Sequence, residues 1–457
     1  MRAALALLLS MTTLLPAAEA PIYYLLWFDT EDYIEPTSDD AALRLATDLE
    51  NMGVKATFKI VGEKARVLES RGRKDVIRAL ARHDIGYHTN YHSIPPAPAM
   101  YLKSLGLLEG AAELERREAS GVTDLRRIFG VTPSCYGQPG SSWGPQANIA
   151  LRRLGIPVYM DEGSHIGLND RPFWYMGLLH MFHLGANSMR ADINAPSKLD
   201  AAKKRFDEAA AKLRAQGGGF IHTYYHPTEF VATEFWDAVN FGRGKYTAPS
   251  DYRRPNLRTK ESSEQTYRIL LDYVAHIKKQ PGVRIVTARD LPQLIDSPHS
   301  LVDVNEIRGN LLRSIDVNGP HSPADQLLAL LGFQSMDVDG PTARVDSTVA
   351  ATSIPRDLFN KGRDEAVEFI EAHKRLPSHV WFGNERLSLA DFTATLAGDQ
   401  SGPTVAVRRG TLGFEKNVAT DPRRTYDWAI HPEGFEAPEL LEMARLQAWT
   451  IKPARLR

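Results

Sequence analysis

A buried strand that ends in acids constrains this chain more than any other feature. Residues 22–28 read IYYLLWF, a run of aromatic and aliphatic side chains that predicts a buried β-strand. The strand leads directly into three acids, Asp29, Glu31 and Asp32. Unpaired carboxylates are costly to bury, and sites are built at the carboxyl ends of strands in barrels and doubly wound sheets. The acids therefore predict a site at the tip of the first strand.

Strands and helices alternate along the first two thirds of the chain. Further strands are expected at residues 55–62, 84–88, 133–140, 156–160, 178–184, 219–226 and 283–288, with helical patterns between most of them. Such alternation indicates parallel βαβ units. Roughly seven or eight strands of this kind favour a (β/α) barrel over an open sheet. We expect this barrel to span residues 21–297.

The pattern changes after residue 297. A chain of 457 residues is longer than one core usually serves. Helical patterns at residues 324–331, 364–373 and 438–449 predict a smaller, mainly helical C-terminal domain over residues 298–457. Residues 364–397 faintly resemble the repeat modules that bind pseudomurein-type cell walls. The alternative is an ordinary helical appendage that packs against the barrel.

The first twenty residues have the features of a signal peptide. Arg2 precedes an apolar run over residues 3–15, and Ala18 and Ala20 form a small-x-small cleavage pattern. The run is too short to span a bilayer, although an uncleaved anchor is an alternative. We expect residues 1–20 to direct export to the periplasm or beyond. The single cysteine, Cys135, excludes an internal disulfide.

The net charge argues against a nucleic-acid partner. The formal charge is −1, with basic and acidic residues spread through the chain. A general nucleic-acid binder would show a basic excess or stripe. A neutral or polymeric substrate is compatible with this composition.

Two histidines are the best partners for the acids of the first strand. His88 and His92 are four residues apart in GYHTNYH, which places both rings on one face if the turn is helical. Catalytic metal sites often use two histidines and a carboxylate and leave a position for water. Asp32 could supply that carboxylate, and Asp29 could accept the proton of the bound water. The spacing also arises by chance, but its place after a strand favours a site.

Three short motifs resemble those of one enzyme family. FDTED at residues 28–32, HTNYH at 88–92 and GFIHTYYHP at 219–227 resemble motifs of the polysaccharide deacetylases, the NodB-homology family of carbohydrate esterase family four. The resemblance spans roughly residues 21–292. It implies an irregular (β/α) barrel of about seven strands. It also implies an exported, metal-dependent hydrolase that removes N-acetyl groups from an amino-sugar polysaccharide or cell-wall glycan, with zinc as the expected divalent metal.

The resemblance assigns roles to five residues. It implies that Asp29 is the general base and that His222 protonates the leaving amine. It implies that the metal ligands are Asp32, His88 and His92.

Two departures from the family pattern stand out. The family's two acids are usually adjacent, whereas this chain has Asp-x-Glu-Asp, so Glu31 stays an alternative ligand to Asp32. The family's third motif carries an arginine that orients the base, and CYGQPG has Gly137 in its place. The second departure leaves the orientation of Asp29 unexplained.

Four further residues are expected at the substrate site. The backbone amide of Tyr136 could hold an oxyanion, and Trp143 could stack on a sugar ring, although packing is the commoner role of such a tryptophan. Asp161 follows a strand, where the family often has another acid. His226 could assist or replace His222, or only join loops by hydrogen bonds. Residues 235–244 form either a lid or a structural loop.

Two other functions remain open from the sequence. One is a hydrolase of small cyclic or linear amides, as in the allantoinase-like branch of the same superfamily. The other is a non-catalytic carbohydrate-binding barrel. The complete set of acids and histidines argues against the second, and Gly137 argues for it.

Overall fold

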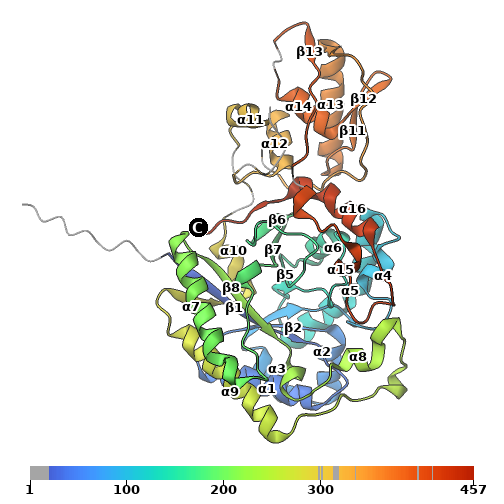
Figure 1. The fold of residues 1–457 in the computed structure, drawn as a ribbon. Coiled ribbons are helices and arrows are strands. Elements are labelled where there is room, and N and C mark those ends of the chain that lie inside the picture. Colours follow the sequence, from blue (N-terminus) through green and yellow to red (C-terminus); the bar gives the residue numbers. More distant parts are fainter. Residues whose placement is uncertain are drawn as a thin grey trace, which may run out of the picture.

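The computed structural model describes most of the chain after the N-terminus. The described residues are 20–296, 299, 302–311, 317, 319–334, 336–398, 401–413 and 415–457. Nearly all of the expected signal peptide lies outside them. A large α/β part forms the lower body in Figure 1, with a smaller lobe above it. Among the described residues, no helix has the length and apolar character needed to cross a membrane.

A curled sheet of ten strands forms the body. Its order is β14-β6-β7-β5-β4-β3-β2-β1-β8, and β9 also pairs with β1. All pairings are parallel except those of β6 with β7 and β14 with β6. The strands are β1 (Ile22–Thr30), β2 (Thr57–Ile60), β3 (Asp84–Tyr87), β4 (Cys135–Tyr136), β5 (Val158–Asp161), β6 (Phe173–Tyr175), β7 (Leu178–Phe182), β8 (Gly219–Tyr225), β9 (Val283–Val286) and β14 (Lys452–Pro453).

The predicted irregular (β/α) barrel is confirmed. Each of the expected strands is present, because buried apolar runs between helices favour parallel pairing. The short strands β6 and β14 were not expected. The barrel is incompletely closed, since the strand order ends at β8 on one side and β14 on the other.

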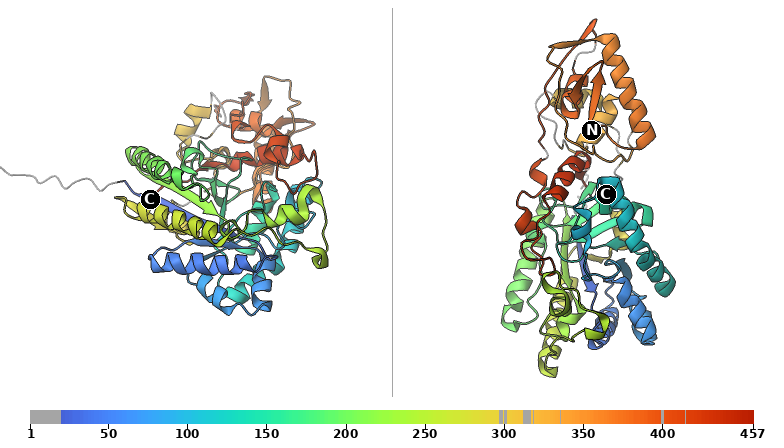
Figure 2. Two further views of the ribbon diagram at one scale, coloured as in Figure 1. Left: turned by 60° about the horizontal axis from the view of Figure 1, so that its bottom comes forward. Right: turned by 90° about the vertical axis from the view of Figure 1, so that its right-hand side faces the viewer.

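Helices cover the outside of the sheet (Figure 2). The longest, α5, has a buried apolar stripe that includes Leu114 and Leu125, and Gly130 ends it with a φ of 73°. The helices of the body are α1 (Thr37–Asn51), α2 (Gly62–Ser70), α3 (Lys74–Leu80), α4 (Pro98–Leu102), α5 (Leu107–Phe129), α6 (Gln146–Leu154), α7 (Leu199–Ala215), α8 (Trp236–Phe241), α9 (Lys260–Lys278) and α10 (Leu291–Leu294).

Strand β1 divides its side chains between two cores. Tyr24, Leu26 and Phe28 belong to the large core under the helices. Leu25 and Trp27 belong to a second apolar cluster inside the barrel. Side chains of a strand alternate in this way, so odd-numbered residues of β1 face the barrel interior. Each aliphatic side chain buried on either face stabilises the fold by about 1.5–3 kcal/mol.

The smaller lobe combines helices with two short two-stranded sheets. The expected helix at 364–373 is the second half of α13, and the stretch after it folds as the hairpin of β11 and β12. The elements are α11 (Val304–Leu311), α12 (Pro323–Leu330), β10 (Ser353–Pro355), α13 (Arg356–His373), β11 (His379–Phe382), β12 (Glu385–Ser388), α14 (Leu389–Leu396) and β13 (Thr404–Ala406).

The end of the chain returns to the barrel. It includes α15 (Pro422–Thr425) and α16 (Pro438–Gln447), drawn in red between lobe and body in Figure 1. Strand β14 pairs with β6, and Tyr175 Oη donates a hydrogen bond to the carbonyl of Ala444 over 3.2 Å. Residues 420–457 therefore pack with the barrel, which differs from the expected division at residue 297.

Candidate active site

Glu31, His88 and His92 converge at the end of β1 and form what we call the three-donor centre. Glu31 Oε2 lies 2.9 Å from His92 Nε2 and 3.2 Å from His88 Nε2, and the two Nε2 atoms are 3.2 Å apart. All three side chains are buried. Burial would raise the pKa of Glu31, but His92 and His226 outweigh it and hold this pKa well below its ordinary value. Glu31 is therefore an ionised carboxylate.

The outer nitrogens of both histidines are already occupied. His88 Nδ1 lies 3.0 Å from the carbonyl of Gly137, which can only accept, so Nδ1 carries the proton. His92 Nδ1 lies 2.6 Å from Ser93 Oγ, and this hydroxyl donates to Asp237 Oδ2 over 3.0 Å, so His92 Nδ1 also donates. Both Nε2 atoms then point at one carboxylate oxygen. Burial would lower the pKa of His92, but Glu31 and Asp237 raise it above its ordinary value.

This donor set fits a divalent metal. Three lone pairs that converge need a cation or a shared proton between them, and two histidines with one carboxylate are a frequent set for catalytic zinc. Glu31, His88 and His92 form the one group of three or more such residues found among the described part of the chain.

The two histidines reach the centre through a strained loop and not through a helical turn. The segment after β3 is irregular, and Thr89 and His92 have positive φ values of 63° and 58°. Non-glycine residues in this region cost about 1–3 kcal/mol each and cluster at functional sites. The amide of His92 donates to Thr89 Oγ1 over 3.1 Å, which holds the loop. The turn is not helical, and the two rings are nevertheless brought together.

The structure turns Asp32 away from the histidines. Asp32 Oδ1 accepts hydrogen bonds from the amides of Ile34 and Glu35 over 3.0 and 2.9 Å, and Oδ2 accepts one from Thr228 Oγ1 over 2.9 Å. Burial raises the pKa of Asp32 to about 6. Asp32 thus joins two loops, and the geometry corrects the sequence prediction by placing Glu31 in the position expected for Asp32.

A pair of matched substitutions separates the two acids. Glu31→Gln should lower zinc affinity by about 100-fold or more, because it removes the anionic donor between the histidines. Asp32→Asn keeps an oxygen for the two backbone amides, so it should bind zinc as the parent does. Zinc content after dialysis, measured by mass spectrometry, shows which of the two acids is a ligand. Loss of zinc in Asp32→Asn with retention in Glu31→Gln would contradict the geometry.

A buried lysine holds Asp29. Lys59 Nζ lies 2.9 Å from Asp29 Oδ1 and 3.1 Å from Asp161 Oδ2, and it donates to the carbonyl of Met160 over 3.0 Å. We call Asp29, Lys59 and Asp161 the acid–lysine cluster. Burial raises the pKa of Asp161, and it would raise that of Asp29 too, but Lys59, His88 and His226 lower the pKa of Asp29 below its ordinary value. The expected site role of Asp161 therefore has a geometric basis.

This cluster explains the glycine that departs from the family pattern. A Cβ atom at Gly137 would lie 2.2 Å from Lys59 Nζ and 2.4 Å from Asp161 Oδ2. The space beside Gly137 is therefore filled by the ammonium of Lys59, which comes from strand β2, two strands away in the sheet. Asp29 therefore does have a positive charge beside it. Lys59 supplies this charge, in place of the arginine that the third motif of the family carries.

Removal of the ammonium should destabilise the protein in a pH-dependent way. Lys59→Met leaves two buried carboxyls without a cation, a loss of about 3–5 kcal/mol in unfolding free energy. Their pKa values then rise above those of the unfolded chain, so stability falls as pH increases. The loss should be larger at pH 8 than at pH 5 in urea denaturation. Substitution of an exposed lysine, Lys55→Met, is the control and should change the unfolding free energy by about 0.5 kcal/mol or less. An equal loss in Lys59→Met at both pH values would contradict the assignment.

His226 lies beside Asp29, whereas His222 does not. His226 Nε2 is 3.8 Å from Asp29 Oδ2, and His226 Nδ1 is 2.6 Å from Glu229 Oε1. Burial would lower the pKa of His226, but Glu31, Glu229 and Asp29 raise it to about 9. His226 is therefore an imidazolium at neutral pH.

His222 lies deeper in the barrel. It pairs with Leu25 in the sheet, about 13 Å of strand before His226. Its Nε2 lies 2.9 Å from Glu162 Oε1 and 2.7 Å from Ser188 Oγ, and its ring packs on Trp27. The structure thus brings the later histidine of the motif to the site, which corrects the prediction for His222.

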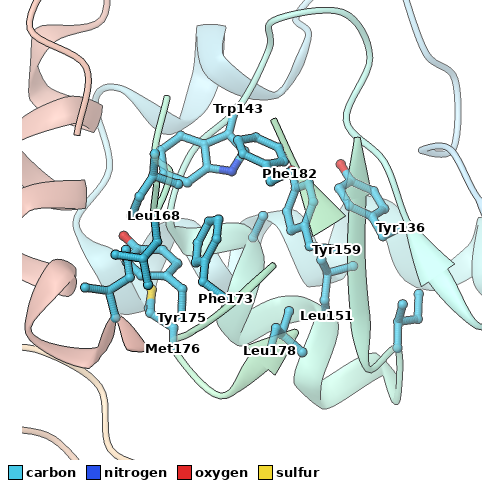
Figure 3. Packing of buried hydrophobic residues seen from close by; sticks show 14 of the residues in the cluster. Tyr136, Trp143, Leu151, Tyr159, Leu168, Phe173, Tyr175, Met176, Leu178 and Phe182 are labelled. Carbon is cyan, nitrogen blue, oxygen red and sulfur yellow. The ribbon is translucent and has the colours of Figure 1, made fainter. Parts of the chain in front are cut away.

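The ring of Trp143, one of the expected substrate contacts, belongs to the core, and so does the ring of Tyr136. Trp143 is fully buried and lies near Phe182 (Figure 3), at a ring centroid distance of 6.4 Å. Its ring also packs on His165 at 5.1 Å. The ring of Tyr136 is 1% exposed and packs edge-on against Tyr159 at 5.2 Å. Trp143 cannot stack on a sugar, so that prediction is wrong. The ring of Tyr136 is structural, and the role of its amide stays a prediction.

Other contributors come from distant segments. Trp236 Nε1 donates to Glu31 Oε1 over 2.9 Å, which fixes the carboxylate. Trp236 and Asp237 lie in the segment expected to be either a lid or a structural loop, and these contacts support the centre directly. Trp428 packs edge-on against His92 at 5.5 Å. A lysine between the apolar residues Phe58 and Ile60 signals Lys59, whereas no local signal identifies Trp428.

Comparisons with known proteins give structural likeness only. No family model and no curated protein matches the chain. A protein assigned as a polysaccharide deacetylase from Mycobacterium smegmatis is 15% identical, with a TM-score of 0.40, and the match covers 61% of this chain and 91% of that one. A family 4 carbohydrate esterase from Streptomyces lividans is 15% identical, with a TM-score of 0.30 and coverage of 57% and 91%. The allantoinase Puue is 13% identical, with a TM-score of 0.38 and coverage of 59% and 88%.

Similar solved structures therefore include polysaccharide deacetylases, the family whose motifs the sequence resembles. The reaction is inferred from the geometry of the site itself.

Proposed function

We propose that this protein is a metal-dependent hydrolase that removes N-acetyl groups from an amino-sugar glycan. One observation carries the proposal: a centre of two histidines and a carboxylate lies beside an ionised aspartate and a cationic histidine. Asp29 is two residues from Glu31, and His226 Nε2 lies 3.8 Å from Asp29 Oδ2. A base and an acid at one centre are what amide hydrolysis requires.

Zinc is the metal we propose for the three-donor centre. Glu31, His88 and His92 would hold it and leave a position open. When bound, such an ion lowers the pKa of a water molecule and polarises an acyl oxygen.

The chain's own groups then move the protons. Asp29 accepts a proton from the attacking water as the water oxygen bonds to the acetyl carbon. Lys59 keeps Asp29 ionised before this step. His226 gives its proton to the amide nitrogen as the carbon–nitrogen bond breaks. Glu229 holds the imidazolium through Nδ1. One water and one amide become acetate and a free amine.

The aromatic rings around the centre support a sugar substrate. Phe235 packs on His226 at 4.8 Å and Trp428 on His92 at 5.5 Å, and both rings are partly exposed. Aromatic faces are favourable surfaces for the apolar side of a sugar ring. A cell-wall glycan agrees with export, which we propose from residues 1–20.

A small amide is the second candidate substrate. It is favoured by the burial of the centre, where Glu31 and His88 are each 2% exposed. A compact amide needs less open space than a polymer. The catalytic groups would act in the same way on either substrate.

Acetate release tests the proposal directly. The purified, zinc-loaded protein is incubated with N-acetylglucosamine oligomers, peptidoglycan and small cyclic amides. Acetate should appear from the acetylated sugars, and Glu31→Gln and His88→Ala should reduce kcat by about 10³-fold or more. Asp32→Asn is the matched control that keeps activity. Zinc binding with hydrolysis of cyclic amides alone would favour the second candidate, and sugar binding without hydrolysis would favour a non-catalytic barrel.

The fall of kcat at alkaline pH should reflect the deprotonation of His226. Because the acid must carry a proton, kcat should fall as pH rises through the pKa of His226, which Glu229 and Asp29 raise against the effect of burial. Glu229→Gln removes a negative partner, so this fall should move to lower pH. The exposed Glu234→Gln should leave it unchanged. A fall that Glu229→Gln does not move would contradict the assignment of His226 as the acid.

A further inference from the structure

We propose that Trp428, on the segment that returns from the smaller lobe, is a wall of the substrate pocket and limits it to chain ends and small molecules. This inference rests on the proposed function and adds a substrate class to it. We call residues 426–431 the returning segment. Its distance along the chain from the catalytic motifs means that no motif comparison would include it.

Trp428 is fitted closely against the site. Its ring lies edge-on to His92, with the centroids 5.5 Å apart. A Cβ atom at Gly140 would lie 2.3 Å from the indole, so only glycine allows this approach, and Gly140 also has a φ of 50°. The amide of Trp428 donates to Ser141 Oγ over 3.0 Å. The indole thus occupies a place that the barrel loops leave for it.

Backbone hydrogen bonds and a small core fix the returning segment. The carbonyls of Ala429 and Ile430 accept from the amides of Arg243 and Gly244 over 2.8 and 2.7 Å. Ile430 is fully buried in an apolar cluster with Tyr33, Ile34, Val61, Trp236 and Phe241. The segment is therefore part of the rim of the site.

The rim leaves the catalytic groups nearly enclosed. Asp29 and His92 are only 4% and 5% exposed. Partial exposure is found at Tyr224, His226 and Phe235, and Trp428 is itself partly exposed at the rim. An internal unit of a polysaccharide needs a groove that is open on both sides, so that the chain can enter and leave. A site covered on the Trp428 side can accept a terminal unit or a small molecule.

The experiment compares Trp428→Ala with the parent on N-acetylglucosamine oligomers of increasing length. Mass spectrometry of the products locates the deacetylated unit. The parent should act on short oligomers and on one terminal unit. Trp428→Ala should also deacetylate internal units and raise the ratio of kcat/KM for the hexamer to that for the dimer by about tenfold or more. Trp381→Ala, an exposed tryptophan on β11 of the smaller lobe, is the control and should behave as the parent does.

A measurement without turnover keeps the two proposals separate. The rate at which a chelator removes zinc should rise about tenfold in Trp428→Ala and stay unchanged in Trp381→Ala, since the wall covers the centre. Internal deacetylation by the parent, or an unchanged chelation rate in Trp428→Ala, would overturn the inference. Absence of acetate from every sugar, with the faster chelation observed, would overturn the proposed function and leave the wall supported.

Discussion

The two-residue period of β1 decides how this site is built. Leu25 and Trp27 face the barrel interior, and Asp29 and Glu31 continue the same series. Asp32 falls on the other side, where backbone amides and Thr228 satisfy its carboxylate. One strand therefore delivers both a candidate base and a candidate ligand to one place, and a shift of one residue would remove both.

Paired opposite charges allow the ionised groups of the site to be buried. The ammonium of Lys59 lies between Asp29 and Asp161, and the imidazolium of His226 is held by Glu229. A lowered pKa at Asp29 and a raised pKa at His226 give the two groups the opposite protonation states that a base and an acid need. The same contacts that allow the charges to be buried also prepare them for proton transfer.

The fold was largely predictable, because buried strands that alternate with amphipathic helices leave few arrangements other than a (β/α) barrel. The pairing of His88 and His92 was also predictable from their motif. The choice of Asp32 over Glu31 was wrong, although the period of β1 could have decided it. His222 was assigned through the motif resemblance alone, whereas β8 runs to Tyr225 and brings His226 to its carboxyl end. Trp143 is core because its loop folds inward. Trp428 reaches the site only because the C-terminal segment packs back against the barrel, and local sequence patterns do not predict such long-range packing.

A crystal structure of the full-length, zinc-loaded protein, with anomalous data at the zinc edge, tests the central claim most directly. One strong peak is expected at about 2.0–2.2 Å from Glu31 Oε2, His88 Nε2 and His92 Nε2, with Asp32 still bound to its loop amides. A peak bound by Asp32, or histidines that hold no metal at full zinc loading, would contradict it.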